Sequence, residues 1–286
     1  MTSKIGSQNS NGKVRKYMID QTIEIEGKNE NRKIAYWESG DSKSKNIVFC
    51  IPGILETKDT FLQLHKCIMG ANSVHIISFD LCGRGASSPL SNDENYLMSV
   101  YLADVKCLIS KFLHQKHRLN SNPINIYLVG TSMGGLLTFY LLQEFGDQIK
   151  GICLNDVGLT LKWVSIFELS KQIRNSNISL EDLSRELNVE SKVLIDVQKN
   201  EHFDLSYKSD LIGMHFYQLL DHFKGILFLI YGGKSVVCTS DVVLEFKIRF
   251  PRASYLNIEE SLHPVTINEL IAEEILSKFK LINYPN

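Results

Sequence analysis

The segment IYLVGTSMGG, residues 126–135, places a serine where it could act as a nucleophile. An apolar run leads directly into GTSMG, and a helical run, LLTFYLLQEF, follows. A sharp turn from strand to helix leaves no room for side chains two positions before and after its centre, which accounts for Gly130 and Gly134. The turn puts the Ser132 hydroxyl at a helix N-terminus, where developing negative charge is favoured. The alternative is a glycine-rich turn with a capping serine, and the surrounding strand and helix favour the nucleophile.

A serine hydroxyl needs a base to remove its proton, and histidine commonly serves. Seven of the eight histidines have ordinary structural explanations, because they lie in or near expected strands or helices or in the insertion at 157–222: His65, His75, His114, His117, His202, His215 and His222. His263 differs, since it follows the last expected strand and precedes the last expected helix. In open α/β sheets, catalytic loops lie at the carboxyl edge of the sheet, where the strands end. We therefore predict that His263 is the general base, the alternative being a surface-loop histidine without a role.

Eight apolar or alternating runs predict the strands that would position these residues. They are residues 18–26, 33–38, 46–51, 74–79, 124–129, 149–154, 226–231 and 253–258. The first two alternate and are joined by GKNENR, which is typical of an antiparallel hairpin, whereas most others are continuous apolar runs typical of a buried parallel sheet. Helical periodicity runs from a cap at Asn92 to Phe112, and again over 265–280. This alternation predicts an α/β fold with a mostly parallel, eight-stranded sheet flanked by helices.

The chain is predicted to divide into three parts. Residues 1–16 form a flexible N-terminal arm, and residues 17–156 and 223–286 form the α/β core. Residues 157–222 have a helical pattern without a strong strand, so we predict a helical cap inserted between the sixth and seventh strands. Its aromatic side chains fit either a substrate pocket under the cap or the core of the cap itself. They are Trp163, Phe167, Phe203, Tyr207, Phe216, Tyr217 and, at its end, Phe223.

Composition narrows the class of partner. A chain of 286 residues that is 44% hydrophobic can build one large core. The 31 basic and 32 acidic residues give a net charge of −1, so no electrostatic footprint for nucleic acid or an anionic membrane is present. No run approaches the roughly 18 apolar residues of a membrane span. We expect a soluble, cytoplasmic protein with a small-molecule partner and six reduced, mostly buried cysteines, and the sequence carries no signal about oligomeric state.

Five motifs, in order over almost the whole chain, resemble those of the α/β-hydrolase fold superfamily and, more closely, its bacterial esterase-like branch. They are VFCIPGILETKDTF, FDLCGRGASS, GTSMGG, LNDVG and SLHP. The resemblance implies that Ser132 is the nucleophile and His263 the general base. It also implies an oxyanion hole formed by the backbone N–H groups of Ile54 and Met133, and no metal or organic cofactor. The family's usual His-Gly pair is Pro52-Gly53 here, which removes an imidazole but leaves the backbone donors.

The acid of the triad has no candidate at the position usual in this family. That position, after the seventh strand, falls on Ser235 or Val236, and neither can stabilise an imidazolium as a carboxylate does. Asp156 follows the sixth strand, from which some members take their acid, and we predict that it serves. The alternative for Asp156 is a turn residue bonded to its own backbone. Asp241 is nearer the usual loop but fits the first turn of a helix, and a Ser-His dyad without an acid is the third alternative.

Other polar positions have structural explanations. The turn formed by residues 83–85 is predicted to be tight, with Arg84 tying loops together by hydrogen bonds. Asp80 and Asp104 are expected to be turn or surface-pairing residues. The segment GGKS is not a phosphate loop, because Phe228 stands where that motif needs its first glycine.

Two functions from different classes remain. The first is a serine hydrolase, most simply of a small, apolar carboxylic ester or thioester; acyl transfer and C–C bond hydrolysis also use serine and stay open. An aspartate at the elbow would have favoured a dehalogenase or an epoxide hydrolase. The second is a binding or regulatory protein that keeps the fold with weak or no catalysis, motivated by the missing loop acid and Pro52. The intact elbow and histidine favour the hydrolase, because folding requires neither.

Overall fold

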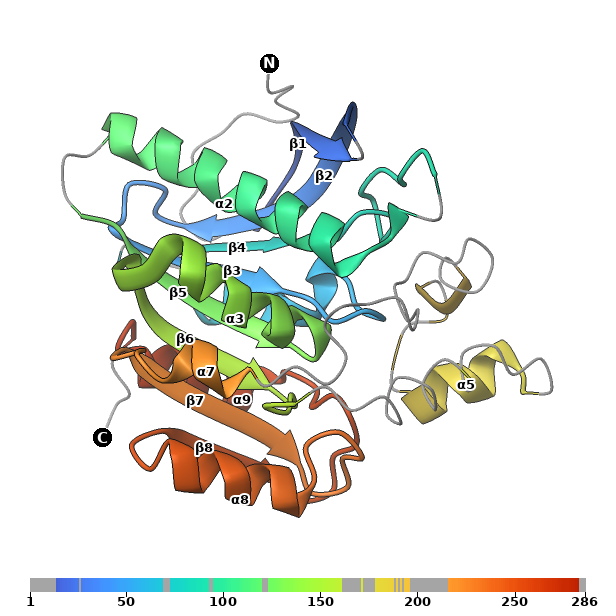
Figure 1. The fold of residues 1–286 in the computed structure, drawn as a ribbon, viewed down its shortest axis with the longest axis vertical. Coiled ribbons are helices and arrows are strands. Elements are labelled where there is room, and N and C mark those ends of the chain that lie inside the picture. The colour runs from blue at the N-terminus through green and yellow to red at the C-terminus, as the bar shows by residue number, and fades with distance from the viewer. Residues whose placement is uncertain are drawn as a thin grey trace.

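The computed structural model describes residues 14–25, 27–68, 73–92, 95–119, 123–160, 171, 178–187, 189, 191, 193–195 and 216–282. Its centre is an eight-stranded sheet in the order β1-β2-β4-β3-β5-β6-β7-β8 (Figure 1). The strands are β1 (Arg15–Ile25), β2 (Lys28–Gly40), β3 (Asn46–Ile51), β4 (His75–Phe79), β5 (Asn125–Thr131), β6 (Ile149–Asn155), β7 (Ile226–Gly232) and β8 (Ser254–Ile258). All eight predicted strands are therefore confirmed.

Strand β2 pairs antiparallel with both β1 and β4. The remaining neighbours in the sheet, in the order β4-β3-β5-β6-β7-β8, pair in parallel. The predicted α/β fold with a mostly parallel sheet is confirmed. The hairpin connection was predicted too long: GKNENR is not a loop, because the ladder continues to the pair Ile25 and Lys28. Gly27 has φ of +76°, the left-handed conformation that two-residue hairpin turns require. The polar residues after it continue the strand.

The predicted N-terminal arm is also too long. Strand β1 begins at Arg15, whose Nε lies 3.0 Å from Glu38 Oε1 on the neighbouring strand. Arg15 and Lys16 are therefore strand residues, held by cross-strand pairing. The rest of the predicted arm, residues 1–13, lies outside the described residues.

Helices cover both faces of the sheet. The described helices are α1 (Leu62–Cys67), α2 (Met98–Leu119), α3 (Met133–Phe145), α5 (Leu180–Leu187), α7 (Tyr217–Leu220), α8 (Ser240–Arg249) and α9 (Glu269–Lys278), with short 3-10 turns η1 (Lys58–Phe61) and η3 (Gly146–Gln148). Helices α2 and α3 lie in front of the sheet in Figure 1, and α9 lies behind it. Asn92 does not cap α2, which begins six residues later; its carbonyl instead accepts the Asn95 N–H in the preceding turn.

The middle strands are buried on both faces, which explains their continuous apolar sequences. Along β5, Leu128 packs in the core under α2 and α3, whereas Val129 packs in the opposite core under α1 and α9. Neither side chain is exposed. These two cores fix β5 rigidly, and β5 carries the segment that ends at Ser132.

Only parts of the predicted cap, residues 157–222, are described. Helix α5 lies beyond the carboxyl ends of the parallel strands (Figure 1). Phe216 stacks on Phe139 of α3 with ring centroids 5.4 Å apart and is fully buried, so it belongs to a core. Four of the other aromatic residues expected in the cap, Trp163, Phe167, Phe203 and Tyr207, lie outside the described residues.

All six cysteines are free, and four of them are buried, as predicted. Burial raises the pKa of the Cys50 and Cys82 thiols well above the ordinary value. Within the described ranges, no helix combines the length and apolar composition needed to cross a membrane.

Candidate active site

The turn between β5 and α3 has the geometry predicted for a nucleophile elbow. Ser132 has φ of 49° and ψ of −115°, an unfavourable conformation for a residue with a side chain. A Cβ atom on Gly134 would lie 2.1 Å from the Ile51 carbonyl oxygen, and one on Gly130 would lie 2.6 Å from the Gly134 carbonyl oxygen. The two glycines therefore let α3 start immediately beside β3 and β5. The serine side chain is left at the carboxyl edge of the sheet.

His263 lies in the loop between β8 and α9 and faces the elbow. Its Nε2 atom is 2.9 Å from Ser132 Oγ, and its Nδ1 atom is 3.1 Å from Asp156 Oδ2. The arrangement fits a neutral imidazole whose Nδ1–H donates to the carboxylate while Nε2 accepts from the hydroxyl. The structure thus brings together Ser132, His263 and Asp156, which are predicted from three separate loops.

Asp156 directly follows β6, and its carboxylate points at the imidazole rather than at its own backbone. The residue is fully buried and has φ of 57°, in the left-handed region. Its N–H donates to the Ile230 carbonyl of β7 over 2.8 Å, which fixes this turn against the neighbouring strand. A buried carboxylate is costly unless a partner compensates it. His263 is that partner, and the geometry does not support the alternative of a self-bonded turn residue.

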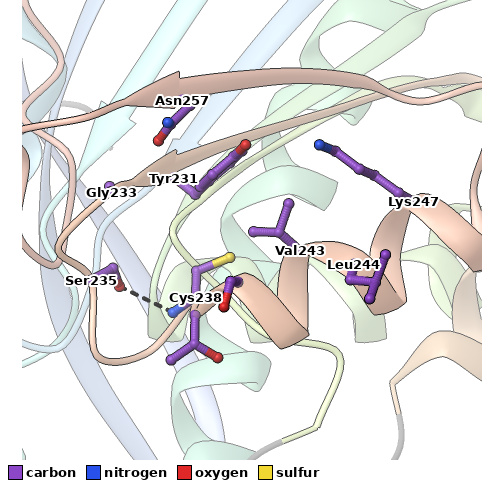
Figure 2. A pocket seen from close by; sticks show the side chains of 11 residues that line it. Tyr231, Gly233, Ser235, Cys238, Val243, Leu244, Lys247 and Asn257 are labelled. Atoms are coloured by element: carbon purple, nitrogen blue, oxygen red, sulfur yellow. Dashed lines mark hydrogen bonds between the residues drawn. The ribbon is translucent and has the colours of Figure 1, made fainter.

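The loop after β7 contains no carboxylate directed at His263. The Ser235 hydroxyl accepts the N–H groups of Val237 and Cys238 over 3.1 and 3.0 Å, and the second bond is drawn in Figure 2. Val236 is 79% exposed. The Lys234 N–H donates to the Ser261 carbonyl over 3.0 Å, so the loop also braces the histidine loop. The Ser235 hydroxyl therefore holds the loop's own shape.

Asp241 lies in the first turn of α8 and is exposed, as its sequence context predicts. The same region borders a cavity of about 600 Å³ between α8 and the ends of β7 and β8. Tyr231, Lys247 and Asn257 project around this cavity in Figure 2. Neither Ser132 nor His263 lines it, so it is separate from the candidate active site.

Ile54 and Met133, predicted to supply an oxyanion hole, flank the serine. Met133 is the first residue of α3, and Ile54 follows Gly53, where an added Cβ would lie 3.4 Å from Ser132 Cβ. Neither N–H group donates a backbone hydrogen bond within the described part of the chain. Arg84 is buried and donates from Nε to the Ile54 carbonyl over 2.9 Å, so its predicted role in tying loops together is confirmed.

Glu56 is an ionisable residue beside the site that the sequence did not single out. Its side chain accepts the Gly53 N–H over 2.6 Å, and the residue is only 9% exposed. Burial raises the pKa of this carboxyl to about 7, against the lowering effects of the Gly53 N–H and of the Thr131 and Thr60 hydroxyls. The sequence signal that could have identified Glu56 is its position directly after the apolar run that ends in PGIL.

Asp80 and Asp104 were predicted to be turn or surface-pairing residues; both are buried, so neither pairs at the surface, whereas the carboxylate of Asp80 does bond to the backbone of a turn. Asp80 Oδ2 lies 2.6 Å from Lys58 Nζ, and the carboxylate also accepts the Ala86 N–H. Asp104 is on α2, which packs against β1, and it pairs with Arg32. Burial raises the pKa of Asp104 to about 6, and Arg32 opposes that rise. The Asp104 carboxylate joins α2 to β2, and the Asp80 carboxylate joins the turn after β4 to η1. Neither carboxylate bonds to Ser132 or His263 in the described part of the chain.

Among the described residues, no group of three or more histidine, cysteine, aspartate or glutamate side chains is placed to hold a metal ion. The three side chains of the candidate site are instead arranged in line, as a nucleophile, a base and an acid would be. This arrangement can transfer the serine proton to the imidazole and stabilise the resulting cation.

Comparison with known proteins places these features in context. Residues 46–177 match a family model described as the alpha/beta hydrolase fold. Over 126 residues the chain is 29% identical to a 3-hydroxybutyrate-oligomer hydrolase from Cupriavidus necator, a match that covers 44% of this chain and 39% of that protein.

Solved structures resemble the chain over nearly its whole length. An alpha/beta hydrolase from Novosphingobium aromaticivorans has 15% identity and a TM-score of 0.68, covering 93% of this chain and 99% of its own. A thermophilic esterase from Thermogutta terrifontis has 14% identity and a TM-score of 0.67, covering 92% of this chain and 98% of its own. At these identities the likeness establishes the fold.

Proposed function

We propose that this chain, which has the α/β-hydrolase fold, belongs to the α/β-hydrolase superfamily and is a serine hydrolase of small, apolar carboxylic esters or thioesters. The observation that carries the proposal is the hydrogen-bonded series from Ser132 through His263 to Asp156. We also propose the finer placement in the bacterial esterase-like branch, with residues 157–222 forming a cap over the site.

The proposed reaction proceeds through an acyl-enzyme. Ser132 Oγ attacks the acyl carbon as His263 Nε2 accepts the hydroxyl proton, and Asp156 stabilises the imidazolium that forms. The N–H groups of Ile54 and Met133 donate to the oxyanion of the tetrahedral intermediate. Its collapse breaks the ester bond, and His263 returns the proton to the leaving alcohol or thiol. Water, deprotonated by His263, then attacks the acyl-enzyme and releases the acid.

The comparison with the Cupriavidus necator protein supports an ester as the scissile group. Oligomers of a hydroxy acid are joined by ester bonds, and that protein is named as a hydrolase of such oligomers. The match spans less than half of either chain, so we extend only the bond type to this protein and propose short-chain esters as its first substrates.

The rival hypothesis of a binding protein without catalysis rested on the missing acid after β7 and on Pro52. The contact between Asp156 and His263 offers an acid from β6 and so weakens the first reason. The second reason is weak as well, because the proposed oxyanion donors are backbone groups of residues other than Pro52. The hydrolase is therefore the better supported function.

A serine-directed probe tests the proposal. Wild-type protein and Ser132→Ala are treated with a fluorophosphonate and assayed with short-chain p-nitrophenyl esters and thioesters. We expect labelling of the wild type alone and a fall in kcat of at least about 10⁴-fold in the variant. Absence of both labelling and turnover in the wild type would favour the binding protein.

A further inference from the structure

Glu56 holds the backbone on both sides of Gly53. Its side-chain Oε2 accepts the Gly53 N–H over 2.6 Å, while its own N–H donates to the Gly53 carbonyl over 3.2 Å. The peptide bond between Gly53 and Ile54 is planar and trans, so the Ile54 N–H points opposite to the Gly53 carbonyl. Fixing that carbonyl therefore fixes the direction of the Ile54 N–H.

The next carbonyl along the chain is fixed from the other side. Ile54 accepts from Arg84 Nε over 2.9 Å, and Arg84 is almost completely buried. The peptide groups before and after Ile54 are thus both held by side chains. Without a side chain, Gly53 is otherwise the most flexible position of this segment.

The same carboxyl faces a buried polar chain under the other candidate residues. The Thr131 hydroxyl, one residue before Ser132, interacts with Glu56 and accepts from Asn155 Nδ2 over 3.3 Å. Asn155, one residue before Asp156, also donates from Nδ2 to the Val265 carbonyl over 2.8 Å, two residues after His263. Thr131 and Asn155 are fully buried. The bonds from Asn155 to Thr131 and to Val265 therefore join the loops that carry Ser132, Asp156 and His263, and Glu56 lies at the Thr131 end of this polar chain.

We propose that Glu56 is a positioning residue, whose side chain orients the Ile54 N–H toward the developing oxyanion and ties that loop to the nucleophile elbow. The inference rests on the proposed function, because it assigns Glu56 a role in the same reaction. Burial raises the pKa of the Glu56 carboxyl and so disfavours its charged form. This fits a residue whose role is to form hydrogen bonds.

Two substitutions separate this role from simple stabilisation. Glu56→Gln keeps an oxygen acceptor for the Gly53 N–H, whereas Glu56→Leu has similar bulk and no acceptor. We expect Glu56→Leu to lower kcat about 10- to 100-fold with KM changed less than about threefold, since losing one oxyanion donor outright costs about 10²–10³. Glu56→Gln should stay within about threefold of wild type in kcat. A boronic acid inhibitor should weaken in Glu56→Leu by the same factor as kcat/KM.

Thr57→Val is the matched control. Thr57 is the next residue, is 8% exposed, and uses its hydroxyl to accept the Asp59 N–H at the start of η1. Its loss should lower the thermal midpoint without lowering kcat. Should Glu56→Leu not fold, Thr131→Val removes the link from the elbow side with almost no change in volume, and it should lower kcat at unchanged KM.

Hydrogen exchange distinguishes failure of this inference from failure of the proposed function. Exchange at the Gly53 amide, which donates to the Glu56 carboxyl, should rise at least tenfold in Glu56→Leu and not in Glu56→Gln, whether or not esters are cleaved. Unchanged exchange, or equal kcat in the leucine and glutamine variants of an active enzyme, would overturn the proposal. A wild type without turnover but with the expected exchange pattern would contradict the hydrolase function and leave the loop-holding role intact.

Discussion

The turn after β6 and the loop after β7 start from neighbouring, parallel strands, yet their polar groups are used in opposite ways. After β6, the Asp156 carboxylate is buried and directed at the His263 imidazole. After β7, the Ser235 hydroxyl turns back to its own backbone, and Val236 extends into solvent. One segment presents a charge to the site, whereas the other braces the histidine loop.

With Asp156 as the proposed acid, this difference indicates that the position of an acid along the chain is less restricted than its position in space. The ends of β6 and β7 are adjacent, and the Asp156 N–H bonds to β7 itself. A carboxylate at the end of either strand would therefore lie near the loop that carries His263. At the end of β6, Asp156 has the left-handed conformation, its carboxylate faces His263 and its N–H bonds to β7.

The largest expected effect comes from removing the charge after β6. Asp156→Asn keeps the side-chain shape, and asparagine tolerates positive φ, so the fold should persist. Losing the charge should lower kcat for a p-nitrophenyl ester by about 10⁴-fold, because the imidazolium is no longer stabilised and the tautomer is no longer fixed. Steady-state kinetics, with circular dichroism to check folding, measures this effect.

Asp241→Asn is the matched control for this prediction. The same atoms change on an exposed carboxyl in α8, and kcat should stay within about twofold of wild type. If Asp241→Asn lowered kcat while Asp156→Asn did not, the acid would be Asp241, which follows β7, and not Asp156. Similar kcat values in both variants and the wild type would support a Ser-His dyad.

The parts predictable from sequence are those coded by local pattern. The position of Ser132 could be predicted because glycines at two fixed positions are a steric requirement of the turn, and that of His263 because it follows the last strand. Asp156 could be predicted only as one of three alternatives. Whether it faces His263 depends on the register of β6 with β7 and on how the Ser235 loop folds, which no short segment encodes.

Burial of single polar residues was the least predictable feature. Asp80, Asp104 and Glu56 occur in segments that also fit exposed turns or helix surfaces, and their partners are distant in sequence or on the backbone. Likewise, the polar residues after Gly27 matched a loop, but cross-strand pairing extends the hairpin through them. Tertiary contacts, rather than local preference, decide these positions.

A smaller effect concerns the backbone at Asp156. Alanine and glycine both remove the carboxylate, but a side chain at φ of 57° costs about 1–2 kcal/mol that glycine does not incur. We expect Asp156→Gly to have a higher free energy of unfolding than Asp156→Ala by about that amount. At Asp241, inside α8, the order should reverse by about 0.5–1 kcal/mol, because glycine disfavours helix. Urea denaturation of the four variants measures both differences, and a more stable Asp156→Ala than Asp156→Gly would contradict a strained turn at Asp156.

The smallest effect is expected in the loop after β7. Ser235→Ala leaves the N–H groups of Val237 and Cys238 without their acceptor, which should lower the free energy of unfolding by about 1 kcal/mol. Because Ser235 makes no contact with His263 in the bonds described, kcat should remain within about twofold of wild type. Val236→Ala, at a side chain that is 79% exposed, should change neither quantity measurably. A fall in kcat for Ser235→Ala at unchanged stability would mean that the β7 loop acts on the histidine directly, and the two segments would then share the positioning of the base.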